Sequence, residues 1–354
     1  MNRWLAFLLL ATLLATLTGC APAEKTPLSV FAAGSLIQPF DELEKAFEAA
    51  YPQIDILNEY HGSIQVIRHV TDIHEKIDVV ATADHSLMPM LMYQTTNPDT
   101  GKRYADWSIR FATNRLGIAY TDRSLYADEI TAENWWEILA RPDVKVGIAD
   151  PRFDASGYRT LMVFKLAEQP AQQPALFHEM FIGQFRLPLS VAKEDGRAII
   201  YVPEILETKE SSHIVIRGSS IQLIALLESG DLDYAFEYES VIQQHSLRLL
   251  ALPNTLNLGD EAQAETYAQV AVKLDFQRFA TVKPEFAGEP IAYGITIPTN
   301  APHPEEAELF IAFLLGPEGR KIMAENHHPL FDPATADAYD ALPASLQALT
   351  QPTP

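Results

Sequence analysis

The feature that most constrains the fold is a regular alternation of short apolar, β-branched runs with helical stripes of apolar residues. Leu28 to Ala32 predicts a strand, after which Phe40, Leu43 and Phe47 recur at the spacing of one helix face. Further strands are predicted at residues 54–59, 78–82, 144–149, 214–217 and 233–238, with helical patterns between them. Because strand–helix–strand units pack as a parallel sheet with helices on both faces, the sequence predicts an α/β fold.

The N-terminus indicates export and lipid attachment. Arg3 precedes an apolar stretch from Leu5 to Leu17 that is too short to span a bilayer, and this stretch leads into Leu17-Thr-Gly-Cys20, a sequence typical of a lipobox. Cys20 is the only cysteine, so a disulfide within the chain is impossible. We therefore predict a lipoprotein signal peptide over residues 1–20, lipidation of Cys20, a tether over 21–27 and an extracytoplasmic protein anchored to the cell membrane.

Length and charge restrict the architecture and the partners. The chain has 354 residues, which favours two globular domains over one. Its formal net charge is -21 at pH 7, with 26 Lys and Arg against 47 Asp and Glu. A nucleic-acid partner is excluded, because binding a phosphate backbone requires a basic surface. If the ligand is a small anion, its site must rely on local dipoles and hydrogen bonds rather than on long-range attraction.

Four predicted strand-to-helix turns carry small hydroxyl or carboxyl residues next to glycine. They are Ala33-Gly-Ser35, His61-Gly-Ser63, Asp154-Ala-Ser-Gly157 and Gly218-Ser-Ser220. A helix N-terminus presents free N–H groups and a partial positive charge, and in an open parallel sheet such turns lie at the edge where ligands bind. Two turns from each of two domains would enclose one small anion. Routine helix capping is the alternative explanation of any single turn.

Tyr238 is a further candidate, because it ends the predicted strand 233–238 and its hydroxyl can donate to an anion oxygen. The alternative is a half-buried tyrosine that only packs in the sheet. The sequence contains no Gly-x-Ser-x-Gly, Walker or zinc-ligand pattern. We therefore expect a binding protein without enzymatic activity and without a resident cofactor.

At these residues the sequence resembles the archaeal-type tungstate/molybdate-binding proteins of ABC importers, relatives of the bacterial molybdate-binding proteins. The matching segments span nearly the whole chain after Cys20 and include Ala33-Gly-Ser-Leu36, Gly62-Ser63, Asp78-Val-Val-Ala-Thr-Ala-Asp84, Gly157-Tyr-Arg159, Asp233-Tyr-Ala-Phe-Glu-Tyr238 and Tyr293-Gly-Ile-Thr296. The resemblance implies a type II periplasmic-binding-protein fold, in which two lobes based on parallel sheets are joined by two crossover strands. Lobe I would comprise residues 28–112 and 290–345, lobe II the inserted residues 113–289, and residues 346–354 a weakly structured tail.

The turns and the resemblance together give the candidate ligand-binding residues: Gly34, Ser35, Ser63, Asp154, Ala155, Ser156, Ser220 and Tyr238. The resemblance implies that an Asp and a Glu also bind the metal of the oxyanion. Asp154 matches the Asp, whereas Ser220 stands at the Glu position. The metal is therefore expected to be tetrahedral or to be bound by Asp154 alone. Because tungsten and molybdenum accept such a ligand and the sulfur of sulfate does not, Asp154 favours the two metal oxyanions.

The function that the resemblance implies is the capture of tungstate or molybdate by a monomer and its delivery to the permease of an ABC transporter. Two alternatives stay open. One is a binding protein for another tetrahedral oxyanion such as sulfate, and the other is a ligand-sensing lipoprotein that signals to a membrane receptor.

Overall fold

The computed structural model describes residues 25–169, 171–274 and 284–353. The predicted signal peptide and the lipidation site Cys20 lie outside the described residues. Within the described ranges, no helix combines the length and the apolar character needed to cross a membrane. The predicted tether ends earlier than expected, because Thr26 and Pro27 already belong to the first strand and pair with Ile54 and Asp55.

The first sheet has seven strands in the order β16-β15-β4-β14-β3-β1-β2. Its strands are β1 (Thr26–Ala33), β2 (Ile54–His61), β3 (Val79–Thr82), β4 (Ser108–Thr113), β14 (Ala292–Thr296), β15 (Leu330–Asp337) and β16 (Thr350–Pro352). Strands β1, β2 and β3 pair in parallel, as the alternating pattern predicts, whereas β14 runs antiparallel to both β3 and β4. We call the part of the molecule built on this sheet lobe I.

The second part, which we call lobe II, contains two sheets. The five-stranded sheet has the order β11-β5-β10-β6-β9, and the four-stranded sheet has the order β13-β12-β8-β7. The strands are β5 (Leu116–Tyr120), β6 (Val146–Ala149), β7 (Ser190–Glu194), β8 (Arg197–Val202), β9 (Ile214–Arg217), β10 (Tyr234–Tyr238), β11 (Arg248–Ala251), β12 (Val270–Leu274) and β13 (Glu285–Ala287). The sequence pattern did not predict the four-stranded sheet, because β7 is almost entirely exposed and lacks an apolar face.

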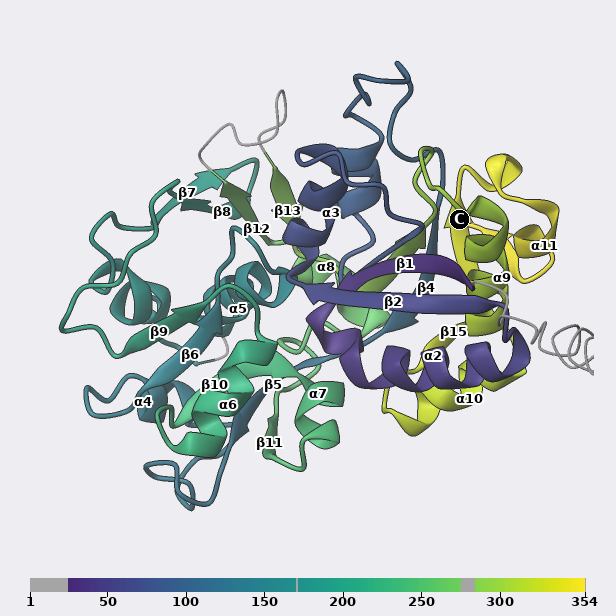
Figure 1. Ribbon diagram of the computed structural model, residues 1–354. Helices are drawn as coiled ribbons and strands as arrows, with labels where there is room; N and C mark the ends of the chain where they lie inside the picture. Colours follow the sequence, from purple (N-terminus) through teal and green to yellow (C-terminus); the bar gives the residue numbers. More distant parts are fainter. Residues whose placement is uncertain (1–24, 170, 275–283, 354) are drawn as a thin grey trace, which may run out of the picture.

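The helices are α2 (Ile37–Ala50), α3 (Ser63–Thr71), α4 (Trp135–Leu139), α5 (Ala155–Ala167), α6 (Ile221–Ser229), α7 (Glu239–Gln244), α8 (Ala264–Tyr267), α9 (Pro304–Leu315), α10 (Pro317–Glu325) and α11 (Ala344–Gln347). In lobe I, α3 covers one face of the sheet and α2 lies on the opposite face, where Phe40 and Phe47 pack against Phe310 of α9 (Figure 1). In lobe II, α5 packs against β6 and β10 of one sheet and β12 of the other. This helix is therefore buried almost all round, which brings its polar side chains into the interior.

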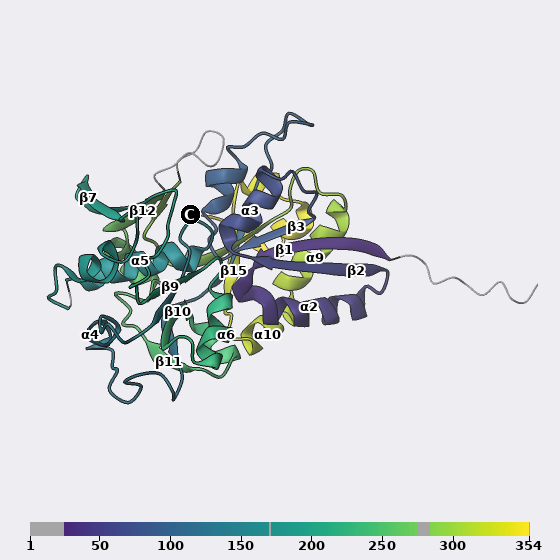
Figure 2. The ribbon, with the colours of Figure 1, turned by 60° about the vertical axis from the view of Figure 1, so that its left-hand side comes forward.

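The two lobes lie side by side and are connected at two places (Figures 1 and 2). The chain passes from lobe I to lobe II between β4 and β5, and it returns between β13 and β14. Both passages lie next to the predicted crossovers, near residues 113 and 290. The turns that follow β1, β2, β6 and β9 face each other across the boundary between the lobes, as the contacts below demonstrate.

The predicted weakly structured tail over residues 346–354 is wrong in part. Residues 350–352 form β16, which pairs in parallel with β15 at the edge of the lobe I sheet. Leu346 is fully buried, and the Thr350 hydroxyl donates a hydrogen bond to the Leu346 carbonyl. Proline is compatible with an edge strand, so the proline-rich composition that suggested a tail does not prevent pairing.

Candidate functional site

The first turn places Gly34 and Ser35 directly after β1, at the start of a short 3-10 helix that leads into α2. A Cβ on Gly34 would lie 3.0 Å from the Ser219 hydroxyl oxygen and 3.0 Å from Ile221 Cγ2, both in lobe II. Glycine thus lets the two lobes approach closely here. The buried Ser35 hydroxyl lies 2.8 Å from the hydroxyl oxygen of Tyr293, in the returning strand β14.

The second turn brings the backbones of the two lobes into direct contact. A Cβ on Gly62 would lie 2.4 Å from the carbonyl oxygen of Phe153, in the third turn, so no larger residue fits there without separating the two segments. The backbone N–H of Ile64 donates to the same carbonyl at 3.0 Å. Ser63 begins α3 and is buried, and its hydroxyl accepts a 2.9 Å hydrogen bond from the Ala83 N–H.

The third turn uses Asp154 as a cap for two helices. One carboxylate oxygen accepts from the Ser156 N–H at 2.8 Å, at the start of α5, and the other accepts from the Ser220 N–H at 3.2 Å, at the start of α6. Burial raises the pKa of Asp154, although the two backbone donors, the nearby Ser219 hydroxyl and Arg159 oppose the shift. The carboxylate is thus held between two helix N-termini, where the partial positive charges favour an anion.

The two neighbouring serines of the fourth turn, Ser219 and Ser220, have different surroundings. The Ser220 hydroxyl donates to Glu237 Oε1 at 3.0 Å, so its proton is directed at a buried carboxyl group. Ser219 instead faces Gly34 of lobe I. Its hydroxyl makes no well-formed hydrogen bond to another described residue, although it is close enough to Asp154 to influence that group's pKa. The hydroxyl of this turn that remains for a ligand therefore belongs to Ser219, whereas the family resemblance had pointed to Ser220.

Tyr238 ends β10, is almost fully buried and lies beside Tyr293, with 5.9 Å between the ring centroids. Its hydroxyl oxygen accepts a 2.7 Å hydrogen bond from Nη1 of Arg159. The Tyr293 hydroxyl in turn accepts a 3.2 Å hydrogen bond from Nδ2 of Asn114. Asn114 lies between β4 and β5, where the chain first passes from lobe I to lobe II. The two tyrosines therefore connect the lobe II sheet with the crossover region.

Glu237 is a buried acid that the sequence pattern did not single out. Its side chain is fully buried, and burial is the main cause that raises its pKa to about 8. Oε1 accepts from the Ser220 hydroxyl and from the Tyr238 N–H, whereas Oε2 has no hydrogen-bond partner in the described ranges. Near neutral pH the group is therefore mostly protonated, which keeps a second negative charge away from Asp154.

Three buried, unpartnered polar atoms gather around Asp154. Besides Glu237 Oε2, they are the hydroxyl oxygens of Ser156 and Ser219, neither of which bonds to another described side chain or backbone group. A buried hydroxyl without a partner is unfavourable, and such groups indicate a missing water, ion or ligand. Ser156 and Ser219 lie at the starts of α5 and α6, whereas Glu237 and Tyr238 end β10. Together they provide neutral donors, an arrangement suited to the oxygens of a small anion.

One group of side chains has the spacing of a cation site. Asp84, His85 and Glu289 each place a ligand atom within 4.8 Å of the others. However, Asp84 already forms a buried ion pair with Arg159, with 3.4 Å between Oδ2 and Nη2. A cation would have to compete with this guanidinium, so the cluster does not favour a metal ion.

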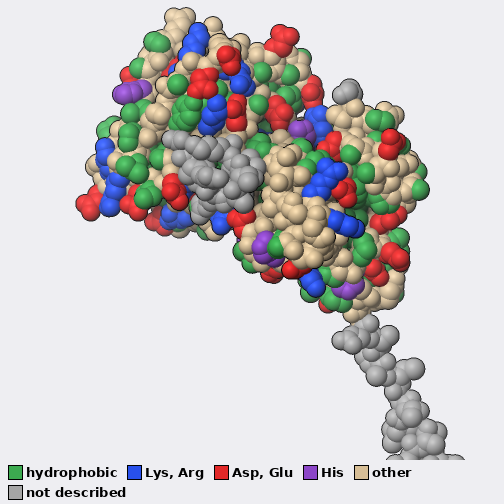
Figure 3. All heavy atoms as spheres, turned by 90° about the horizontal axis from the view of Figure 1, so that it is seen from above, with side chains coloured by type: hydrophobic (Ala, Val, Ile, Leu, Met, Phe, Trp, Pro, Cys, Tyr) green, Lys and Arg blue, Asp and Glu red, His purple; other side chains and the backbone are tan. Residues whose placement is uncertain are grey.

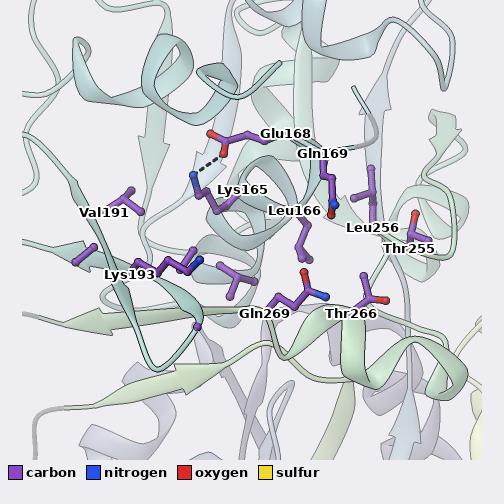
Figure 4. A pocket seen from close by; sticks show the side chains of 14 residues that line it. Lys165, Leu166, Glu168, Gln169, Val191, Lys193, Thr255, Leu256, Thr266 and Gln269 are labelled. Atoms are coloured by element: carbon purple, nitrogen blue, oxygen red, sulfur yellow. Dashed lines mark hydrogen bonds and ion pairs between the residues drawn. The ribbon is translucent and has the colours of Figure 1, made fainter. Parts of the chain in front are cut away.

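An open pocket of about 720 Å³ lies elsewhere, in lobe II near the end of α5 (Figure 4). Lys165 and Lys193 line it, and Lys165 is paired with Glu168. None of the sequence-predicted site residues line this pocket. On the face seen in Figure 3, acidic and basic side chains are interspersed over both lobes, which agrees with a site that does not depend on a strong surface field.

The structure brings most of the predicted site residues to one place. Ser63, Ser156 and Tyr238 are buried beside the boundary between the lobes, Asp154 caps α5 and α6, and Ala155 is the buried first residue of α5. Sequence reasoning missed Ser219, Glu237 and Tyr293, and left out Arg159. A signal for Tyr293 existed, because it lies in a crossover strand.

Comparison with known proteins places the chain in a family. Residues 28–327 match the family model for bacterial extracellular solute-binding proteins. The molybdate/tungstate-binding protein WtpA of Thermococcus kodakarensis is 38% identical over 335 residues, which cover 93% of this chain and 88% of that protein. The protein of the same name from Pyrococcus abyssi is 37% identical over 332 residues, covering 92% and 90%.

Solved structures agree with the fold. The periplasmic molybdate-binding protein of Azotobacter vinelandii has a TM-score of 0.53 at 15% identity, covering 86% of this chain and 99% of that one. The substrate-binding protein of an ABC transporter from Agrobacterium tumefaciens has a TM-score of 0.54 at 13% identity, covering 88% and 80%. The predicted periplasmic-binding-protein fold and the resemblance stated from the sequence are therefore confirmed. The chain belongs to the family of bacterial extracellular solute-binding proteins.

Proposed function

We propose that this protein captures tungstate or molybdate between its two lobes and delivers the oxyanion to the permease of an ABC transporter. The proposal is supported above all by two buried hydroxyls, those of Ser156 and Ser219, which have no hydrogen-bond partner within the described ranges and lie at the starts of α5 and α6. Helix N-termini and neutral hydroxyls stabilise an anion without a cationic side chain, which suits a chain of net charge -21.

The set of donors comes from both lobes. In lobe II, Ser156, Ser219 and Tyr238 supply hydroxyls, and Ala155 supplies the first backbone N–H of α5. The next two N–H groups of this helix already donate to Asp154. In lobe I, Gly34, Ser35 and Ser63 lie at the facing turns. Ser220 contributes through Asp154 and Glu237 rather than as a direct donor. The relatives named for molybdate and tungstate support this choice of anion.

Asp154 gives a chemical reason to prefer a metal oxyanion. Its carboxylate oxygens accept one backbone hydrogen bond each, and an ionised carboxylate has lone pairs for about four partners in all. A lone pair therefore remains for a tungsten or molybdenum atom. With Ser220 in place of a second carboxylate, we infer a tetrahedral oxyanion or one extra ligand from Asp154, and not two.

The cellular setting is also part of the proposal. The lipobox ending at Cys20 supports an extracytoplasmic protein with a lipid anchor, and we infer that it acts as a monomer in front of its permease. A sulfate-binding protein and a ligand sensor are the alternatives. Sulfate offers the same four oxygens but no metal atom for Asp154.

Titration calorimetry of the purified protein with sodium tungstate, molybdate and sulfate tests the function. We expect tungstate and molybdate to bind in a 1:1 ratio, at least about tenfold more tightly than sulfate, which corresponds to about 1.4 kcal/mol. Tighter binding of sulfate would support the alternative oxyanion, and the absence of binding by all three would contradict the proposal.

A further inference from the structure

Arg159 is a buried cation next to Tyr238, on α5 of lobe II, and only 3% of its surface is exposed. Its Nη1 donates to the Tyr238 hydroxyl at 2.7 Å and to the Ala83 carbonyl at 2.7 Å. Its Nη2 lies 3.4 Å from Asp84 Oδ2. One guanidinium thus contacts the candidate ligand tyrosine, in its own lobe, and two consecutive residues of the other lobe.

The carboxylate of Asp84 balances the positive charge of Arg159. Burial is the largest single influence on Asp84 and opposes its ionisation. The positive charge of Arg159, together with His85 and the hydrogen bonds that the carboxylate accepts, outweighs burial and lowers the pKa of the carboxyl group. The same carboxylate accepts hydrogen bonds from the Tyr158 hydroxyl, on lobe II, and from the Ser86 hydroxyl at 2.7 Å. The charge of Arg159 is therefore neutralised from lobe I, and it is not left to attract the ligand.

The hydrogen bond to Tyr238 has a fixed direction. A guanidinium has only donors, so in this pair the tyrosine oxygen must accept. The single O–H proton of Tyr238 must then point to another acceptor, and none of the described residues accepts a hydrogen bond from it. Arg159 in this way turns Tyr238 into a donor for a ligand oxygen.

This orientation depends on the closed arrangement of the lobes. If the lobes separated, Arg159 would lose both Ala83 and Asp84, and a mostly buried guanidinium would be left without its counter-charge. Arg159 would then no longer be held in its present position. Without Arg159 in place, the direction of the Tyr238 O–H bond would no longer be fixed.

We propose that Asp84 and Arg159 form a latch between the lobes that orients the Tyr238 hydroxyl toward the ligand and does so only in the closed form. Arg159 is a positioning residue in this account, because it acts on the ligand through Tyr238. This inference rests on the proposed function, because it assumes that the ligand is an oxyanion whose oxygen accepts the Tyr238 proton.

A double-mutant cycle with tungstate as the probe tests the latch. Arg159→Gln and Tyr238→Phe should each weaken tungstate binding by at least about tenfold. The double variant should bind within about threefold of the weaker single variant, because both changes remove the same oriented donor. Arg217→Gln is the matched control, since Arg217 is exposed beside the fourth turn and donates to the Ile216 carbonyl; its affinity should equal that of the unmodified protein. If the loss of tungstate affinity in the double variant equals the product of the losses in the two single variants, the proposal is overturned.

Small-angle scattering separates the latch from the choice of ligand. Asp84→Asn should increase the radius of gyration of the anion-free protein, because the latch is broken whether or not an anion is present. Thermal unfolding confirms that each variant is folded, and Asp84→Asn replaces Arg159→Gln in the cycle if the latter does not fold. An unchanged radius of gyration would overturn the latch, whereas failure of the unmodified protein to bind tungstate would overturn the proposed function alone.

Discussion

Replacing Gly62 by alanine should weaken tungstate binding by at least about tenfold, equivalent to about 1.4 kcal/mol or more. The added methyl group would lie 2.4 Å from the Phe153 carbonyl oxygen, a distance that real contacts do not tolerate. Gly62 belongs to lobe I and Phe153 to lobe II, so the clash exists only when the lobes are closed. The backbone angles of Gly62, φ -62 and ψ 144, are accessible to alanine, so the folded lobe itself is not strained.

Titration calorimetry gives the affinity of the variant, and chemical denaturation gives its stability. The free energy of unfolding should change by no more than about 1 kcal/mol, the cost of a poorer helix cap. Gly183→Ala is the matched control, since a Cβ at Gly183 meets no atom of the described chain within 4 Å. Equal tungstate affinity of Gly62→Ala and the unmodified protein would mean that closure at this turn is not required for binding.

The contribution of Glu237 to the stability of the protein should fall as the pH rises from about 4.5 to about 8. The pKa of Glu237 is raised to about 8 by burial, while a glutamic acid in an unfolded chain titrates near about 4.3. In this window the folded state binds more protons than the unfolded state, so the free energy of unfolding decreases with pH and levels off above the folded pKa. The expected loss is on the order of a few kcal/mol. The raised pKa of Asp154 acts in the same direction.

Glu237→Gln removes this contribution, because an amide keeps the acceptor for Ser220 and Tyr238 and cannot ionise. Urea unfolding at about pH 5.5 and about pH 8 should show a clearly smaller difference for the variant than for the unmodified protein. Glu325→Gln, at an exposed position at the end of α10, should leave the difference unchanged. If Glu237→Gln retains the full pH dependence, the proton is not held by Glu237.

Much of the fold follows from periodicity in the sequence. The stripe of Phe40, Leu43 and Phe47 predicts α2 because those side chains face the core, and Gly230 ends α6 with φ 84, as its place after the helix predicts. The four-stranded sheet could not be predicted in this way. Its strand β7 has no buried face, and β13 is only three residues long.

The limits of the site prediction have a different cause. Spacing identified the fourth turn but not which of its serine hydroxyls stays without a partner among the described residues, because the hydrogen bond of Ser220 to Glu237 joins residues that are distant in the sequence. The protonation of Glu237 and the orientation of Tyr238 depend on neighbours distant in sequence, such as Asp154 and Arg159. A single sequence records neither distance nor burial, so these roles became visible only in three dimensions.

The central claim is that one oxyanion lies between the lobes, at the starts of α5 and α6. Anomalous diffraction at the tungsten edge from crystals grown with tungstate tests it most directly. We predict one strong tungsten peak per chain, with oxyanion oxygens within hydrogen-bonding distance of the Ser156, Ser219 and Tyr238 hydroxyls and with Asp154 adjacent to the metal. A peak instead in the lobe II pocket beside Lys165 and Lys193, or no peak between the lobes, would contradict the account.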